Sequence, residues 1–217
     1  MNRRILNIAL IVSLLGLTLA LIPKVLALRV PGNHQGFEPV QPLAYSHRLH
    51  AGELQIPCLY CHSGAEKSRH AGIPSASTCM NCHQFISAPR TEVRAEEELA
   101  KKEGREPVRV VSDELRKLYD ALALNDELKR DPNRVQKPIQ WVRIHKVPDF
   151  VAFDHRPHVN AGVECQKCHG AIESMERVRQ FETLEMGWCL DCHRGHDGTL
   201  IEGQPVDASS DCAACHY

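Results

Sequence analysis

The sequence predicts a mainly α chain with much irregular loop and one N-terminal transmembrane helix. Three observations lead to this fold class. The pattern Cys-x-x-Cys-His occurs five times in 217 residues. The chain holds only 5 Phe, 4 Tyr and 2 Trp, which is little aromatic mass for the core of a domain of this size. A long apolar run follows two arginines at the N-terminus.

The five repeated patterns account for all ten cysteines, which are Cys58, Cys61, Cys79, Cys82, Cys165, Cys168, Cys189, Cys192, Cys212 and Cys215. The pattern is typical of c-type haem attachment, in which two thiols join the haem vinyl groups and the next histidine ligates the iron. The predicted proximal ligands are His62, His83, His169, His193 and His216. We therefore predict five c-type haems that replace an ordinary core, and weak folding without them.

Two other functions use Cys-x-x-Cys pairs, namely zinc ribbons and redox-active dithiols. Zinc ribbons use these pairs two at a time, whereas this chain has an odd number of them. A thioredoxin-like dithiol occurs once, within a βαβ pattern. Both alternatives therefore account poorly for the sequence, and the net charge of −1 leaves no basic footprint for nucleic acid.

The apolar run extends from Ile5 to Ile22 and has two interpretations. It can be a secretory signal peptide, with Thr18-x-Ala20 or Val25-x-Ala27 as the cleavage site. It can also be an uncleaved membrane anchor, because about 20 apolar residues cross a bilayer. We favour the anchor, since the run is longer than a typical signal core.

The charges around the anchor predict its orientation. Arg3 and Arg4 place its start on the cytoplasmic side. We therefore expect residues 1–28 to form a single-pass anchor in a bacterial cytoplasmic membrane, with residues 29–217 as a periplasmic pentahaem domain. Both interpretations of the N-terminus export this domain.

An internal duplication divides the domain into two modules, residues 40–87 and 145–196. Each module begins with aromatic-x-His-Arg-x-His and continues with two haem patterns. The fifth pattern lies in a C-terminal segment, residues 197–217. A cysteine-free insert, residues 88–140, separates the two modules.

The sequence of the insert predicts two helices. Thr91 can cap a helix that runs to Gly104. The charges of this helix allow two i,i+4 pairs, Glu97–Lys101 and Glu98–Lys102. Ser112 can cap a second helix that Asp131-Pro132 ends, and its apolar face comprises Leu115, Leu118, Tyr119 and Leu122. The insert is either a solvated hairpin packed on the haem domain or a docking surface for a partner subunit, and the sequence leaves both open.

An iron that only transfers electrons needs a second axial ligand. The His-x-x-His pairs place two imidazoles on one helix face, from which each can reach a different iron. The predicted distal ligands are His47, His50, His155 and His158, with His145 as the fifth. Weaker candidates are His70, Met175 and Met186. His34 and His196 are expected to be solvent histidines.

Several longer segments resemble a known family. They comprise residues 41–52, 71–83, 147–155 and 186–194. These segments are similar to the membrane-anchored pentahaem cytochrome subunit of bacterial alternative complex III, a respiratory quinol oxidoreductase. The His-x-x-His ahead of a haem pattern also resembles class III multihaem cytochromes c. The resemblance covers most of residues 40–217, and the insert is its least specific part.

The resemblance implies a class III-like fold wrapped around five haems. It also implies partners: an iron–sulfur subunit, polytopic quinol-binding subunits and a monohaem cytochrome c. In such a complex the chain would relay electrons from quinol oxidation towards a periplasmic acceptor, and it would not be catalytic by itself.

Two alternative functions belong to other classes. A free-standing, membrane-anchored quinol dehydrogenase would need a quinol pocket at the membrane face and one weakly ligated haem. A nitrite or sulfite reductase would need an open iron, which eight histidines outside the haem patterns argue against. The sequence leaves open the haem order, the potentials, the quinone and the acceptor.

Overall fold

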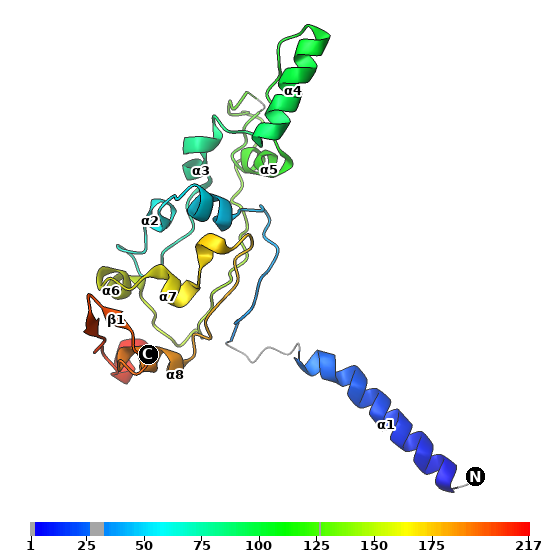
Figure 1. Ribbon diagram of the computed structural model, residues 1–217, viewed down its shortest axis with the longest axis vertical. Coiled ribbons are helices and arrows are strands. Elements are labelled where there is room, and N and C mark those ends of the chain that lie inside the picture. The colour runs from blue at the N-terminus through cyan, green and yellow to red at the C-terminus, as the bar shows by residue number, and fades with distance from the viewer. Residues whose placement is uncertain (1–2, 27–32, 126) are drawn as a thin grey trace.

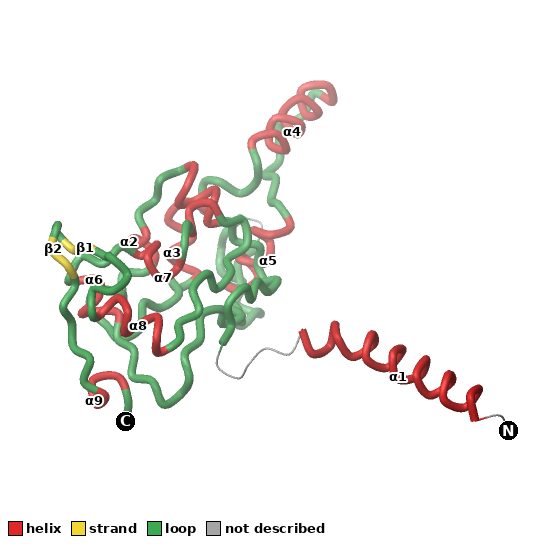
Figure 2. Tube along the Cα trace, turned by 60° about the horizontal axis from the view of Figure 1, so that its bottom comes forward, coloured by secondary structure: helices red, strands yellow, loops and turns green. Residues whose placement is uncertain are grey.

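A computed structural model describes residues 3–26, 33–125 and 127–217. Short helices joined by loops make up the domain, and a separate helix, α1, precedes it (Figure 1). The elements after α1 are η1 (Arg48–Glu53), α2 (Cys58–Cys61), α3 (Ala76–His83), α4 (Arg90–Glu103), α5 (Asp113–Ala121), α6 (His155–Asn160), α7 (Cys165–His169), η2 (Ile172–Ser174), α8 (Met186–His193) and α9 (Cys212–Cys215). One small antiparallel hairpin, β1 (Leu200–Ile201) and β2 (Gln204–Pro205), lies before α9 (Figure 2). The predominance of helix and loop is as predicted.

Helix α1 (Arg3–Leu26) has 24 residues. Its segment Arg3–Ile22 has a mean hydropathy of 2.6 and none of it is buried. By length and composition this helix can cross a membrane, although a signal sequence has the same properties. The predicted end of the anchor at residue 28, the start of the domain at residue 29 and the Ala27 cleavage position lie outside the described residues.

Large apolar side chains form little core. Among the described residues the buried apolar ones are Ala65, Ala88, Ala100, Leu118, Tyr119 and Ala123. The two large ones, Leu118 and Tyr119, belong to α5 in the insert and not to the two modules. The modules therefore have the thin core that the composition predicts.

The first helix of the insert, α4, differs from prediction at its start. Pro89 occupies the N-cap position and Thr91 lies in the first turn, so the cap prediction for Thr91 is wrong. Proline suits the beginning of a helix because its missing N–H needs no partner there. The helix ends at Gly104, which has a φ of +66°, as predicted.

The ion pairs of α4 also differ from those that the sequence predicts. Within the described residues neither predicted i,i+4 pair forms. Arg105 instead folds back and pairs with Glu96 and Glu103. The Glu96 carboxylate also accepts a hydrogen bond from Val108 N at 2.9 Å, so Glu96 closes the turn that follows the helix.

Helix α5 begins as predicted. The Ser112 hydroxyl accepts a hydrogen bond from Leu115 N at 3.4 Å, and the apolar face packs inward at Leu118 and Tyr119. The helix ends at Ala121 rather than at Asp131-Pro132, because Ala123 adopts a φ of +55° and the chain turns. The Tyr119 hydroxyl donates to the His83 carbonyl at 2.6 Å, which joins the insert to α3.

The two modules hold each other through equivalent contacts. In the first module the loop after α2 accepts a hydrogen bond, at Arg69 O, from His155 N at 3.2 Å. In the second, the loop after α7 accepts one, at Met175 O, from Arg48 N at 2.9 Å. Each module thus contacts the helix of the other module's histidine pair.

Glycine 52 allows η1 to pack directly on η2. A Cβ at this position would overlap the carbonyl group of Glu173. Because this obstacle is backbone, it cannot move without displacing η2. The close packing therefore fixes η1, and with it His50, relative to the second module.

We predict that Gly52→Ala destabilises the domain by about 1–3 kcal/mol through this overlap. The matched control is Gly187→Ala in α8, where a Cβ would meet no atom within 4 Å. The control should be neutral or slightly stabilising, because alanine favours a helix. Denaturant unfolding of the two variants checks this, and equal stabilities would contradict the packing of η1 on η2.

Candidate functional site

Each Cys-x-x-Cys-His pattern lies on a short helix. The first cysteine begins α2, α7 and α9, whereas in α3 and α8 the pattern occupies the last turns. In a helical turn, residues three apart share a face, so both thiols of a pattern point the same way and the histidine follows directly. None of the ten cysteines forms a disulfide within the described residues.

Four of the five pattern histidines face a second imidazole. The ring centroids of His47 and His62 are 6.4 Å apart, and those of His155 and His169 are also 6.4 Å apart. The corresponding distances are 6.1 Å for His50–His83 and 5.9 Å for His158–His193. Two imidazoles that bind one metal ion from opposite sides, at ~2.0 Å per metal–nitrogen bond, place their centroids ~6 Å apart. All four pairs have this spacing.

Each His-x-x-His pair lies against the histidines of two patterns. His47 faces the first pattern and His50 the second, while His155 faces the third and His158 the fourth. One aromatic ring supports each pair. Tyr45 contacts His47 and His50 at centroid distances of 4.8 and 4.4 Å, and Phe153 contacts His155 and His158 at 4.8 and 4.9 Å.

Backbone carbonyls orient most of these imidazoles. The Nδ1 atoms of His62, His83 and His193 lie 2.6–2.8 Å from the carbonyl oxygens of Gly72, Ile86 and Ser209. Those of His50, His155 and His158 lie 2.8–2.9 Å from the carbonyls of Ser46, Arg69 and Asp154. A carbonyl only accepts, so each Nδ1 carries the proton and each Nε2 keeps a lone pair for a metal.

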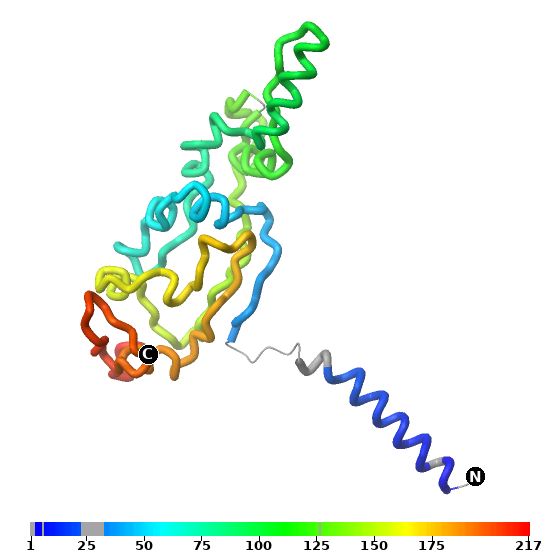
Figure 3. Tube along the Cα trace, viewed as in Figure 1, coloured from blue at the N-terminus to red at the C-terminus, as the bar shows by residue number. Residues whose placement is uncertain are grey.

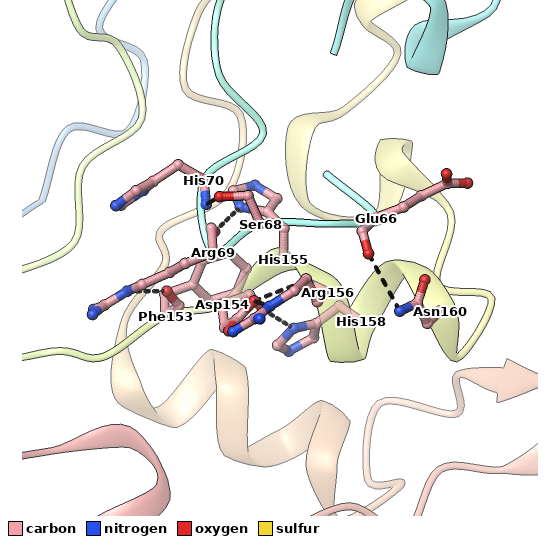
Figure 4. A network of polar contacts seen from close by, with 10 residues as sticks. All are labelled: Glu66, Ser68, Arg69, His70, Phe153, Asp154, His155, Arg156, His158 and Asn160. Carbon is pink, nitrogen blue, oxygen red and sulfur yellow. Dashed lines mark hydrogen bonds and ion pairs between the residues drawn. The ribbon is translucent and has the colours of Figure 1, made fainter. Parts of the chain in front are cut away.

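Asp154 positions the helix and one imidazole of the second histidine pair. Its carboxylate accepts a hydrogen bond from Arg156 N at 2.9 Å and so caps α6, and its carbonyl accepts from His158 Nδ1 (Figure 4). Hydrogen bonding to the Arg156 guanidinium lowers the pKa of this carboxyl to about 2. In the same network Arg69 Nε donates to Phe153 O at 2.8 Å.

Burial keeps several imidazoles neutral. It lowers the pKa of His47 and of His145 to about 4 and that of His169 to about 3. A neutral imidazole is the form that binds a metal. One difference separates the two copies: His47 Nδ1 is buried without a hydrogen-bond partner, whereas its counterpart in His155 is paired with Arg69.

The structure places His145 beside His169 and not opposite His216. The two rings are 4.3 Å apart at 75°, and His169 Nδ1 lies 3.2 Å from His145 Nε2. This placement replaces the expectation that His145 is the fifth distal ligand. The ring of Phe150 lies beside His216, with centroids 5.8 Å apart.

The weaker candidates do not face a pattern histidine in any ring contact of the described residues. His70 is exposed, and its ring extends away from His155 in Figure 4. Met186 is 60% exposed. Met175 contributes its carbonyl to Arg48 N. His196 is exposed, as expected of a solvent histidine. The same expectation is wrong for His34, because its Nδ1 atom is buried without a hydrogen-bond partner.

The five patterns follow one another in space in an order that differs from the sequence. Cys61 of the first pattern lies near Cys82 of the second, and Cys58 lies near Cys165 of the third. Burial raises the pKa of Cys168 to about 11, and nearby Cys189 of the fourth pattern adds to the rise.

Cys189 in turn lies near Cys215 of the fifth pattern. The spatial order is therefore second, first, third, fourth, fifth. Helices α3, α2, α7 and α8 follow one another down the domain in this order (Figure 3).

Comparisons with known proteins agree with a haem protein. Residues 151–217 match the family described as cytochrome c7 and related cytochrome c. The chain is also 22% identical, over 196 residues, to the menaquinone reductase multiheme cytochrome c subunit of Nitratidesulfovibrio vulgaris (strain Hildenborough). That alignment covers 81% of this chain and 76% of the relative. The matches support covalently bound c-type haem and an electron-transfer protein.

The residues present fit a c-type haem. Two thiols share one helical face, the next imidazole has its Nδ1 engaged, and a second imidazole lies at the distance expected across a metal. A structural zinc site needs a cluster of four ligands. Within the described residues no three His, Cys, Asp or Glu side chains lie close enough together to form part of such a cluster.

The capping carboxylate gives a pH prediction. The pKa of Asp154 is lower in the folded chain than the ordinary value of 3.8, so folding favours the ionised form. The contribution of this carboxylate to the free energy of folding is present above about pH 4 and is lost as the pH falls towards about 2. Asp154→Asn keeps a capping oxygen but removes the charge.

We expect the melting temperature of Asp154→Asn to lie below wild type above about pH 4, and the difference to close towards about pH 2. Asp149→Asn is the control, because Asp149 has no ion pair in the part of the chain that the structure describes. Thermal melts across this pH range check the prediction. A difference that does not change with pH would contradict it.

Proposed function

We propose that this chain holds five c-type haems and acts as the electron-relay subunit of a membrane quinol oxidoreductase. The four imidazole pairs, 5.9–6.4 Å apart, are the observation that supports it best. Ten cysteines would bind haem covalently, with His62, His83, His169, His193 and His216 as proximal ligands. His47, His50, His155 and His158 would be the distal ligands.

Bound haem supplies one-electron redox chemistry, and the polypeptide supplies placement. Each histidine pair, fixed on one short helix, ties two haem patterns together. Cys58 of the first module lies near Cys165 of the second, at the middle of the series. This single file of patterns suits transfer along a chain better than it suits chemistry on a substrate.

We place the subunit in a complex of the alternative complex III type. The support is the resemblance of four segments and the similarity to a protein named as a menaquinone reductase subunit. The partners would be an iron–sulfur subunit, polytopic quinol-binding subunits and a monohaem cytochrome c. Helix α1 would anchor the chain in the cytoplasmic membrane, with the haem domain in the periplasm.

A free-standing quinol dehydrogenase is the second candidate. The fifth pattern favours it, since Phe150 rather than a ligand is the ring beside His216. The other four patterns have the closed arrangement of a relay. We therefore keep the relay as the main proposal.

We predict that His158→Met raises one of the five reduction potentials. A thioether ligand favours the reduced iron relative to imidazole. The expected rise exceeds about 59 mV, which is tenfold in the ratio of reduced to oxidised centre. The control is His196→Met, at a side chain that is 64% exposed. A spectroelectrochemical titration with no component displaced would contradict the assignment of His158.

Purification of the full chain in mild detergent tests the complex. The relay proposal predicts that iron–sulfur and polytopic membrane subunits co-migrate with it, and that a quinol analogue reduces the assembled complex faster than the separated chain. Rapid reduction of the separated chain by the same quinol would favour the free-standing dehydrogenase instead.

A further inference from the structure

The proximal histidine of the third pattern differs from those of the first, second and fourth patterns in what its Nδ1 contacts. His62, His83 and His193 each contact a backbone carbonyl. His169 instead contacts the side chain of His145, at 3.2 Å between Nδ1 and Nε2. One haem pattern of the described chain thus has an imidazole in the position that a carbonyl occupies elsewhere.

The protonation of the two rings follows from the geometry. If His169 is to ligate iron through Nε2, its single proton resides on Nδ1, which then donates. His145 Nε2 must accept, so the proton of His145 is on its own Nδ1. The centroid distance of 4.3 Å is also too short for a metal between the two rings, which would need ~6 Å.

The segment that carries His145 is held on both sides by glutamine side chains. Gln41 forms two hydrogen bonds with the backbone of Val142, at 2.8 and 3.0 Å. Gln180 is completely buried and accepts from Lys146 N at 3.2 Å. These two side-chain amides hold the irregular segment at two points, three residues before His145 and one residue after it. The position of the imidazole is therefore built into the fold.

We propose that His145 is a positioning residue for the third haem, which holds His169 in one orientation and lowers the potential of the iron that His169 ligates. This inference rests on the proposed function, because it needs haem at the third pattern. An imidazole nitrogen is a stronger base than an amide carbonyl. It draws the Nδ1 proton of His169 more strongly, makes that ligand more electron-rich and stabilises the oxidised iron.

The test compares His145→Leu with His145→Gln in the full, detergent-solubilised chain. Leucine removes the acceptor, whereas glutamine can still offer a carbonyl oxygen. His70→Leu is the matched control, since His70 is an exposed histidine on a loop. Redox titration and electron paramagnetic resonance are measured on each variant.

In His145→Leu one of the five components should rise by about 59 mV, a tenfold change in its reduced-to-oxidised ratio. His145→Gln should lie between this variant and wild type, and His70→Leu should match wild type. Every iron should stay low-spin. A high-spin ferric signal in His145→Leu would overturn the proposal, because His145 would then be an axial ligand. An unchanged titration would overturn it as well.

If the leucine variant does not accumulate, His145→Gln decides alone. Wild-type spin state with a modest rise of one component supports the positioning role, and a high-spin signal refutes it. Failure of the proposed function looks different, since wild-type chain would then show no haem spectrum at all.

Discussion

The structure depends on one spacing, the distance of about 6 Å between paired imidazoles on different elements. To maintain it, η1 with its N-cap His47, and α6, must each present two histidines to two separate haem patterns. The modules solve this by bracing each other: Arg69 of one holds His155 of the other, while the Met175 carbonyl holds η1. Because the bracing is reciprocal, neither histidine pair is positioned by its own module alone.

This arrangement explains a domain with so little apolar core. Among the described residues the largest fully buried side chains are Tyr119, Leu118 and Gln180, and of these Gln180 alone lies in the histidine-bearing modules. Polar contacts do much of the positioning there, with carbonyls that orient imidazoles and glutamine amides that fix irregular segments. Such contacts define direction but bury little apolar surface, so we expect the bound haems to provide most of the cohesion. The insert is the exception, because α5 packs a conventional apolar face.

The sequence predicted the parts that are local. The haem patterns, the histidine pairs and the cap at Ser112 follow from spacing within a few residues; the structure confirms the cap and puts His155 and His158 on one helix. The sequence could not place His145, because its neighbour His169 is 24 residues away and two distant glutamines decide its position. The end of α5 was missed for a similar reason, since a turn at Ala123 stops it before any proline. The spatial order of the patterns also depends on contacts between the modules.

The central claim is that all ten cysteines carry haem, two to each macrocycle. Intact-mass analysis of the exported chain tests it most directly, because each covalent haem adds a fixed mass that survives denaturation. The account predicts a single species with five added haems and no free thiol. A chain without added macrocycles, or one that retains zinc and releases it to a chelator, would contradict the account.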